Sequence, residues 1–130
     1  EEAVHIPEEL RYTSEHEWVR LEGDRAVLGI TAYAQDQLGD IVFVELPEIG
    51  DVFDANGVFG TVEAVKTVSD LFTPLAGEIT DVNTGLESHP EYVNEDPYGN
   101  GWMIKLKMVN PDQYDGLLTP QGYLNLIGEE

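Results

Sequence analysis

Cysteine is absent from the 130 residues of the sequence, and only 6 residues are Lys or Arg. The lack of thiols excludes disulfides, thiolate nucleophiles, zinc–thiolate sites and iron–sulfur clusters. The 26 acidic residues give a formal net charge of −20. A surface that binds nucleic acid or anionic lipid needs clustered basic side chains, so neither partner is expected.

Long apolar runs and familiar catalytic motifs are missing as well. No apolar run reaches the roughly 18–20 residues of a membrane span, and there is no phosphate-binding loop, nucleophile elbow or dinucleotide fingerprint. The histidines, His5, His16 and His89, are far apart and share no metal-ligand spacing. Proximity of two carboxylates carries no information among 26 acids. On the residues alone, an enzyme is therefore the least supported class.

The sequence does contain a succession of short strand-like segments separated by turns. Strands are expected at 17–21, 26–31, 41–44, 58–65, 68–72, 77–82 and 102–108. Short helices are expected after a Thr31 cap, from Pro111 and from Pro120. This spacing predicts a mainly β fold, a small sandwich or barrel decorated with a few short helices, and the length fits one domain.

Among three lysines, one stands apart. Lys105 and Lys107 alternate with apolar residues, as solvent-facing strand positions do. Lys66 lies between two strand-like segments, 60–65 and 68–72, which places it at the tip of a hairpin. Its amine would project into water, where a modifying enzyme can reach it. On the residues alone, an ordinary exposed turn lysine remains the simpler interpretation.

The residues around this lysine follow an ordered pattern: Glu63-Ala64-Val65-Lys66, then Asp70, Pro74 and Gly77-Glu78. The pattern resembles the lipoylation segment of the glycine cleavage H-protein family, in which Ser is more usual at the position of Ala64. Other stretches that resemble the family are 14–19, 29–31, 34–35, 38–47, 82–83 and 101–104. The resemblance extends from about Tyr12 to the last residue, with several motifs in one order.

The resemblance implies a fold class: a flattened β-barrel or sandwich of two antiparallel sheets, related to lipoyl and biotinyl carriers, with a few short helices. It implies a single lipoyl-carrier domain over residues 1–130. Within that domain we expect an N-terminal extension at 1–10 and a helical tail at 117–130.

The resemblance also implies the site. Lys66 would carry lipoic acid in amide linkage, and Glu63 would be recognised by the enzyme that attaches it. A surface cleft for the loaded arm would include Glu17 and Asp70, with Glu15 beside them. A carboxylate in that cleft could hold a protonated amine through a charge-assisted hydrogen bond.

The function implied by the resemblance is that of a non-catalytic shuttle in glycine catabolism. The carrier would take an aminomethyl group from glycine decarboxylase (P protein) to a tetrahydrofolate-dependent aminomethyltransferase (T protein). Dihydrolipoyl dehydrogenase (L protein) would then reoxidise it, and a lipoate ligase or lipoyl transferase would load it. With a net charge of −20, docking to these partners is expected to be electrostatically assisted and to weaken with salt.

The expected compartment is the bacterial cytoplasm, or the mitochondrial matrix in a eukaryote. The lack of an Arg-rich, transit-like segment favours the former.

Three other kinds of carrier could share this fold. A biotin carrier usually has methionines on both sides of its lysine, whereas Val65 and Thr67 flank Lys66. A lipoyl domain of a 2-oxoacid dehydrogenase usually has Asp-Lys-Ala and a Pro/Ala linker, and neither is present. A relative with the same fold that acts in lipoate relay rather than glycine cleavage remains the alternative.

Overall fold

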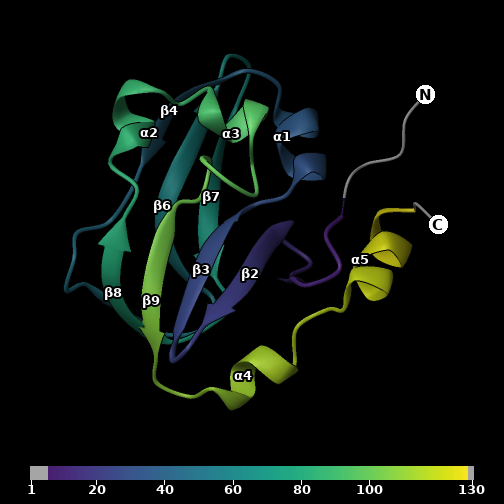
Figure 1. Cartoon of the computed structure of the whole chain (residues 1–130). Helices are drawn as coiled ribbons and strands as arrows, with labels where there is room; N and C mark the ends of the chain where they lie inside the picture. Colours follow the sequence, from purple (N-terminus) through teal and green to yellow (C-terminus); the bar gives the residue numbers. More distant parts are fainter. Residues whose placement is uncertain (1–5, 129–130) are drawn as a thin grey trace.

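The computed structural model describes residues 6–128 and shows two antiparallel sheets that face each other (Figure 1). The six-stranded sheet has the order β1-β2-β3-β9-β8-β5, and the three-stranded sheet the order β4-β6-β7. The strands are β1 (Arg11–Tyr12), β2 (Glu17–Glu22), β3 (Arg25–Ile30), β4 (Ile41–Glu45), β5 (Val52–Phe53), β6 (Gly57–Ala64), β7 (Val68–Thr73), β8 (Gly77–Val82) and β9 (Ile104–Met108). The helices are α1 (Ala32–Leu38), α2 (Gly85–Ser88), α3 (Tyr92–Glu95), α4 (Asp112–Asp115) and α5 (Pro120–Ile127). The predicted sandwich with a few short helices is confirmed, as two separate sheets rather than a closed barrel.

Alternate strand residues fill the space between the sheets, because successive side chains in a strand point to opposite faces. Ala26, Leu28 and Ile30 of β3 point inward, and Val62 of β6 and Leu71 of β7 point toward them from the other sheet. All of these side chains are almost fully buried. The segments expected at 26–31, 58–65 and 68–72 therefore agree with β3, β6 and β7 to within one residue at each end.

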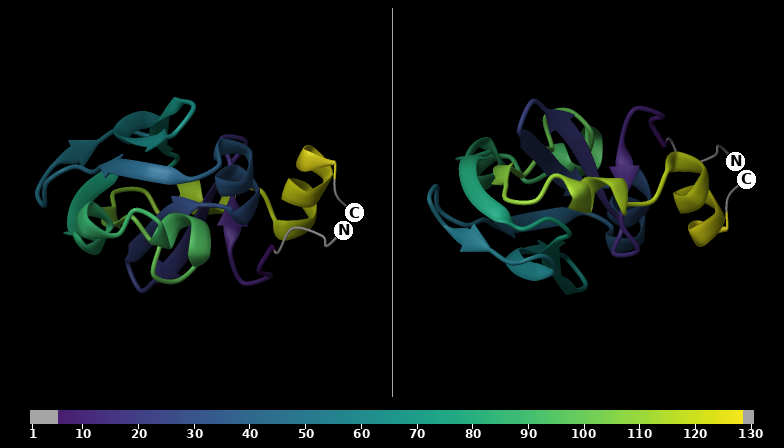
Figure 2. Two further views of the ribbon diagram at one scale, coloured as in Figure 1. Left: turned by 90° about the horizontal axis from the view of Figure 1, so that it is seen from above. Right: turned by 90° about the horizontal axis from the view of Figure 1, so that it is seen from below.

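A second buried cluster lies on the outer face of the six-stranded sheet, under α5. It consists of Leu10, Tyr12, Trp18, Val27 and Tyr123. Figure 2 shows α5 to one side of the two sheets. The Thr119 side chain caps α5 by accepting the Gly122 N–H at 3.1 Å, and Gly128 ends the helix in the left-handed conformation. A helix is thus present within the expected tail at 117–130, of which residues 129 and 130 lie outside the described range.

Several elements differ from the sequence-based expectation. β1 and β5 are strands of two residues each, too short to show an alternating pattern. β9 begins at Ile104 rather than at residue 102, because the Trp102 N–H bonds the Gly99 carbonyl in the preceding turn. Of the expected extension at 1–10, residues 1–5 lie outside the described range, while Leu10 is buried in the second cluster. Among the helices of residues 6–128, none is long and apolar enough to span a membrane.

Gly60 lies at a close approach between β4 and β6. The pairing of β6 with β7 shifts register between Val58 and Gly60, and a Cβ at Gly60 would overlap the Glu45 carbonyl oxygen of β4. The overlapping atom belongs to backbone, so a side-chain rotation cannot relieve it. Gly60 therefore allows the three strands to pack in the observed register.

We predict that Gly60→Ala lowers the free energy of unfolding by about 1–3 kcal/mol, because the added methyl forces β4 and β6 apart. The matched control is Gly116→Ala. At Gly116 the nearest atom to an added Cβ is 3.6 Å away, and the change should stay within about 0.5 kcal/mol. Urea denaturation of both variants measures the difference. Equal midpoints would show that the strands can separate at no cost.

Candidate functional site

The hairpin of β6 and β7 presents Lys66. Glu63 of β6 pairs with Val68 of β7, so the chain reverses direction between these two residues. Val65 and Lys66 occupy the bend, and both side chains are exposed. The expectation that Lys66 lies at a hairpin tip is confirmed.

Backbone hydrogen bonds hold this tip in place. The Ala64 N–H donates to the Thr67 carbonyl at 2.8 Å, and the Val65 N–H donates to the Asp40 carbonyl at 3.2 Å. The second bond ties the tip to the segment between α1 and β4. Neither Val65 nor Lys66 has a positive φ, which explains why no Gly or Asn is needed at the bend.

Two adjoining cavities lie beside the tip. The outer cavity, of about 400 Å³, is lined by Lys66 and by Asp36 and Asp40 near the end of α1. The inner cavity, of about 290 Å³, is lined by Glu15, His16, Glu17, Ile30, Tyr33, Ala34, Gln37, Leu38, Val62, Ser69, Asp70 and Leu71. Gln37 and Leu38 line both cavities. The two cavities therefore meet at α1, and Lys66 lines the outer one.

Glu17 is the buried acid of the inner cavity, and it joins the two sheets. It lies in β2 and is 2% exposed. Its Oε2 accepts the Phe72 N–H of β7 at 2.7 Å, and its Oε1 lies 3.5 Å from the Thr13 hydroxyl, a long hydrogen bond. Because β7 is an edge strand of its sheet, the carboxylate satisfies a backbone N–H that no strand pairs with.

Burial raises the pKa of Glu17 to about 8, the Phe72 N–H opposes the shift, and the Glu15 charge adds to it. Two opposing preferences meet at this carboxyl. Both neighbouring donors favour the ionised form, whereas desolvation favours the neutral form. A cation entering the inner cavity would supply the missing counter-charge and stabilise the carboxylate. The arrangement therefore suits a small, positively charged guest.

Three of the residues expected at a cleft are brought together by the fold. Glu15, Glu17 and Asp70 all line the inner cavity, although Glu15 and Asp70 are exposed while Glu17 is buried. Glu63 is elsewhere. It lies on the exposed face of the hairpin, in register with Phe43 of β4 on one side and Val68 on the other.

The sequence did not reveal the rest of the cavity wall. His16 shares no metal-ligand spacing with another histidine in the sequence, yet it lines the inner cavity together with Tyr33 and Gln37 of α1. The Thr31 cap and the Gly39 stop predict that α1 exists, but no pattern in the sequence indicates which strands it faces. One signal for His16 appears only in the backbone, where its φ is 69°, a left-handed value that is uncommon for a residue other than Gly.

Lys66 presents an exposed side chain on a hairpin tip whose backbone is anchored, so its amine can accept a covalent group. Within residues 6–128, no group of three or more His, Asp or Glu side chains could hold a metal ion. An open sandwich that presents one lysine at a hairpin tip, beside a sheltered acidic cavity, is a carrier domain of the lipoyl and biotinyl type.

Comparison with known proteins is consistent with this class and narrows it. The family model described as Glycine cleavage H-protein matches residues 10–130. The chain is 57% identical over 124 residues to the glycine cleavage system H protein of Bacteroides fragilis, covering 95% of this chain and 98% of the relative. It is 55% identical over 126 residues to that of Geobacillus kaustophilus, covering 97% and 99%. The chain belongs to the glycine cleavage H-protein family.

A solved structure agrees with the fold. The crystal structure of a glycine cleavage system H protein from Mycobacterium marinum matches with a TM-score of 0.87 and 40% sequence identity, covering 95% of this chain and 99% of that one. The expected family and the expected sandwich are both confirmed.

We predict that Glu17→Gln changes how stability depends on pH. The folded-state pKa of Glu17 is raised to about 8 from an ordinary value of 4.5. Its contribution to stability is therefore fully present below about pH 4.5 and is lost as pH rises through the folded-state value. Between these limits the parent should lose up to about 1.4 kcal/mol per pH unit relative to Glu17→Gln.

Urea midpoints of parent and variant at several pH values between 5 and 9 measure this difference. Glu15→Gln, at an exposed neighbour in the same cavity, removes a charge that adds to the Glu17 shift, so it should weaken the pH dependence of the parent without abolishing it. A constant difference for Glu17→Gln would mean that Glu17 stays ionised despite its burial.

Proposed function

We propose that this chain is the lipoyl-bearing carrier of a glycine cleavage system. It would take an aminomethyl group from glycine decarboxylase to the tetrahydrofolate-dependent aminomethyltransferase, and dihydrolipoyl dehydrogenase would reoxidise it. The observation that carries the proposal is the anchored, exposed Lys66 in a chain of this family. The chain itself would be non-catalytic, and its place of action would be the cytoplasm of a bacterium.

Lipoic acid fits the residues around Lys66. The exposed amine can be acylated. The outer cavity that Lys66 lines shares Gln37 and Leu38 with the inner cavity. When attached, the dithiolane supplies the sulfur chemistry that a chain without cysteine lacks. The protein's own contribution is to present the arm, exclude water from its loaded end and hold a positive charge against Glu17. No observation on the described residues favours the lipoate-relay alternative.

The partners proposed are the three enzymes of the cycle and a lipoate ligase or lipoyl transferase. An attaching enzyme must bring its active site to the Lys66 amine itself, so it must cover the hairpin tip. Glu63 lies three residues before Lys66 on the exposed face. This position makes it a suitable recognition element for that enzyme.

We predict that Lys66→Arg leaves the fold intact but abolishes lipoylation, because a guanidinium cannot be acylated in place of the amine. Intact mass after incubation with a lipoate ligase and lipoate measures the modification, and glycine–carbon dioxide exchange with the decarboxylase measures the function. In the same assay Glu63→Gln should be modified more slowly than the parent.

Glu78→Gln is the matched control for Glu63, since Glu78 is exposed in β8 and away from the hairpin tip. Lipoylation of Lys66→Arg would refute the attachment site. Equal rates for Glu63→Gln and Glu78→Gln would remove Glu63 from recognition.

We predict that Glu17 protects the loaded arm. An aminomethyl group on sulfur loses ammonia and formaldehyde in water, and a hydrogen bond to a charged group contributes about 1.5–3 kcal/mol. Glu17→Gln should therefore release ammonia from the loaded protein about tenfold faster when no aminomethyltransferase is present. Asp70→Asn should have a smaller effect, because Asp70 is exposed. Release rates equal to the parent's in both variants would show that neither acid holds the amine.

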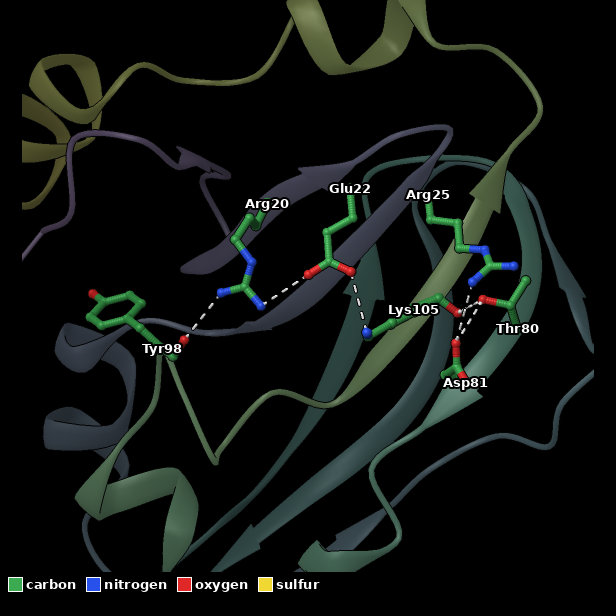
Figure 3. Close-up of polar contacts among 7 residues, drawn as sticks. All are labelled: Arg20, Glu22, Arg25, Thr80, Asp81, Tyr98 and Lys105. Carbon is green, nitrogen blue, oxygen red and sulfur yellow. Dashed lines mark hydrogen bonds and ion pairs between the residues drawn. The ribbon is translucent and has the colours of Figure 1, made fainter.

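The basic residues are segregated from Lys66. Of the 6 basic residues, four lie on the outer face of the six-stranded sheet: Arg20, Arg25, Lys105 and Lys107. There they lie beside acids: the Lys105 amine is 3.2 Å from Glu22, and Arg25 is 4.0 Å from Asp81. Figure 3 draws both contacts. The hairpin end is left with Lys66, which loses its charge on acylation. This end then offers a partner an acidic surface.

We predict that docking is steered by charge at this end. Asp36→Lys, beside Lys66 in the outer cavity, should raise the apparent KM of the decarboxylase for this protein several-fold at low salt. Asp115→Lys changes the net charge equally in α4, whose Gln113 side chain contacts Ala76 beyond the far end of β7, and should have little effect.

The difference between the two variants should shrink as ionic strength rises through about 0.15 M, where the Debye length is about 8 Å. Equal KM values at every salt concentration would mean that the acidity of the hairpin end does not orient the carrier.

A further inference from the structure

The C-terminal helix reaches the inner cavity through one side chain. Tyr123 of α5 is fully buried and stacks on Tyr12 with ring centroids 4.9 Å apart. Its hydroxyl lies 2.9 Å from Nδ1 of His16 and 2.8 Å from Oγ1 of Thr31. His16 lines the cavity, and Thr31 caps α1, whose residue Tyr33 also lines it. One phenol therefore supports two walls of the cavity that receives the arm.

The backbone at His16 is held in a left-handed conformation. Its φ is 69°, its N–H donates to the Thr13 carbonyl at 3.0 Å, and its carbonyl accepts the Thr31 N–H at 3.0 Å. Such a conformation persists only where surrounding contacts fix it, and it often occurs at functional sites. Here it places the His16 ring between Tyr33 and Tyr123, at centroid distances of 5.1 and 5.7 Å.

The number of available hydrogens determines which atom donates in the two hydrogen bonds of the Tyr123 hydroxyl. Thr31 Oγ1 already accepts the Ala34 N–H at 3.1 Å and is fully buried, so its own hydrogen is left for the Tyr123 oxygen. The phenol hydrogen then goes to Nδ1 of His16, which must be unprotonated. The reverse direction would leave the Thr31 hydroxyl hydrogen without an acceptor among the described residues, an arrangement that is rare in buried sites.

Two further features agree with this direction. Burial lowers the pKa of His16, which favours the neutral imidazole. Burial also raises the pKa of Tyr123, so the phenol keeps the proton that it donates. Tyr123 does not line the inner cavity, so it acts on the cavity walls through His16 and Thr31.

We propose that Tyr123 is a positioning residue for the inner cavity. Its hydroxyl holds His16 as the neutral tautomer with the ring hydrogen on Nε2. The proposal rests on the proposed function and adds the C-terminal helix to it. A neutral ring beside Glu17 does not repel a cationic guest, and its Nε2–H is a donor for an acceptor atom of the arm. Without the phenol hydroxyl, the ring is free to turn or to change tautomer, and the cavity holds the loaded arm less well.

The test compares Tyr123→Phe with Tyr114→Phe. The first keeps the ring that stacks on Tyr12 and removes only the hydroxyl. The second makes the same chemical change in α4, where Tyr114 packs beneath the Arg11 guanidinium and does not line the inner cavity. Nitrogen NMR of the His16 ring in the unlipoylated proteins reports which ring nitrogen carries the hydrogen. Ammonia release from the lipoylated, loaded proteins reports how well the arm is held.

We expect a protonated Nε2 and an unprotonated Nδ1 in the parent and in Tyr114→Phe, and a mixture of tautomers in Tyr123→Phe. Lipoylation by intact mass should be equal in all three proteins, while ammonia release should be at least threefold faster in Tyr123→Phe. A hydrogen on Nδ1 in the parent, or a tautomer and a release rate unchanged in Tyr123→Phe, overturns the proposal.

Failure of the proposed function is distinguishable from failure of this proposal. If the parent itself cannot be lipoylated or loaded, the carrier role is wrong. The NMR comparison on the unlipoylated proteins still decides whether Tyr123 sets the His16 tautomer. If Tyr123→Phe loses the dispersed spectrum of a folded protein, Thr31→Ser, which keeps the hydroxyl, should retain the Nε2–H form, and its loss there would refute the hydrogen-bond direction.

Discussion

The hydrogen bond between the Glu17 carboxylate and the Phe72 N–H connects the two sheets beside the inner cavity. It satisfies a backbone N–H on the free edge of β7. It also fixes the Glu17 side chain in the wall of the inner cavity. The same burial that keeps this carboxylate in place raises its pKa to about 8. Structural support and readiness for a cation are therefore two aspects of one side chain.

How far the sequence predicted this molecule depends on the range of the interactions involved. Short apolar runs bounded by turn residues are a local signal, so the strands other than the two-residue β1 and β5, the hairpin and the exposed Lys66 follow from it. The bend at Val65 and Lys66 lacks turn-forming residues because a distant partner, the Asp40 carbonyl, supports it. The cavity wall from α1 and the link from Tyr123 to His16, 107 residues apart in sequence, arise only when the sheets and α5 pack, and no local pattern encodes them.

The basic side chains are concentrated on one face of the molecule. Interleaved acids and bases on the outer face of the six-stranded sheet neutralise one another over short distances, as the contacts of Glu22 and Asp81 show. The excess of acid remains on the other surfaces. The net charge of −20 is therefore distributed unevenly over the surface. Acylation of Lys66 would increase this asymmetry by removing a positive charge from the hairpin end.

The bond from the Val65 N–H to the Asp40 carbonyl has a further consequence. It fixes the origin of any chain attached to Lys66, so such a chain behaves as a tether with one immobile end. For short flexible tethers the effective concentration of the free end near its anchor is in the millimolar range. If Lys66 carries the arm as proposed, the protein's own cavity would be a competing binding site at high local concentration. A partner would then have to outcompete that intramolecular site in order to unload the arm.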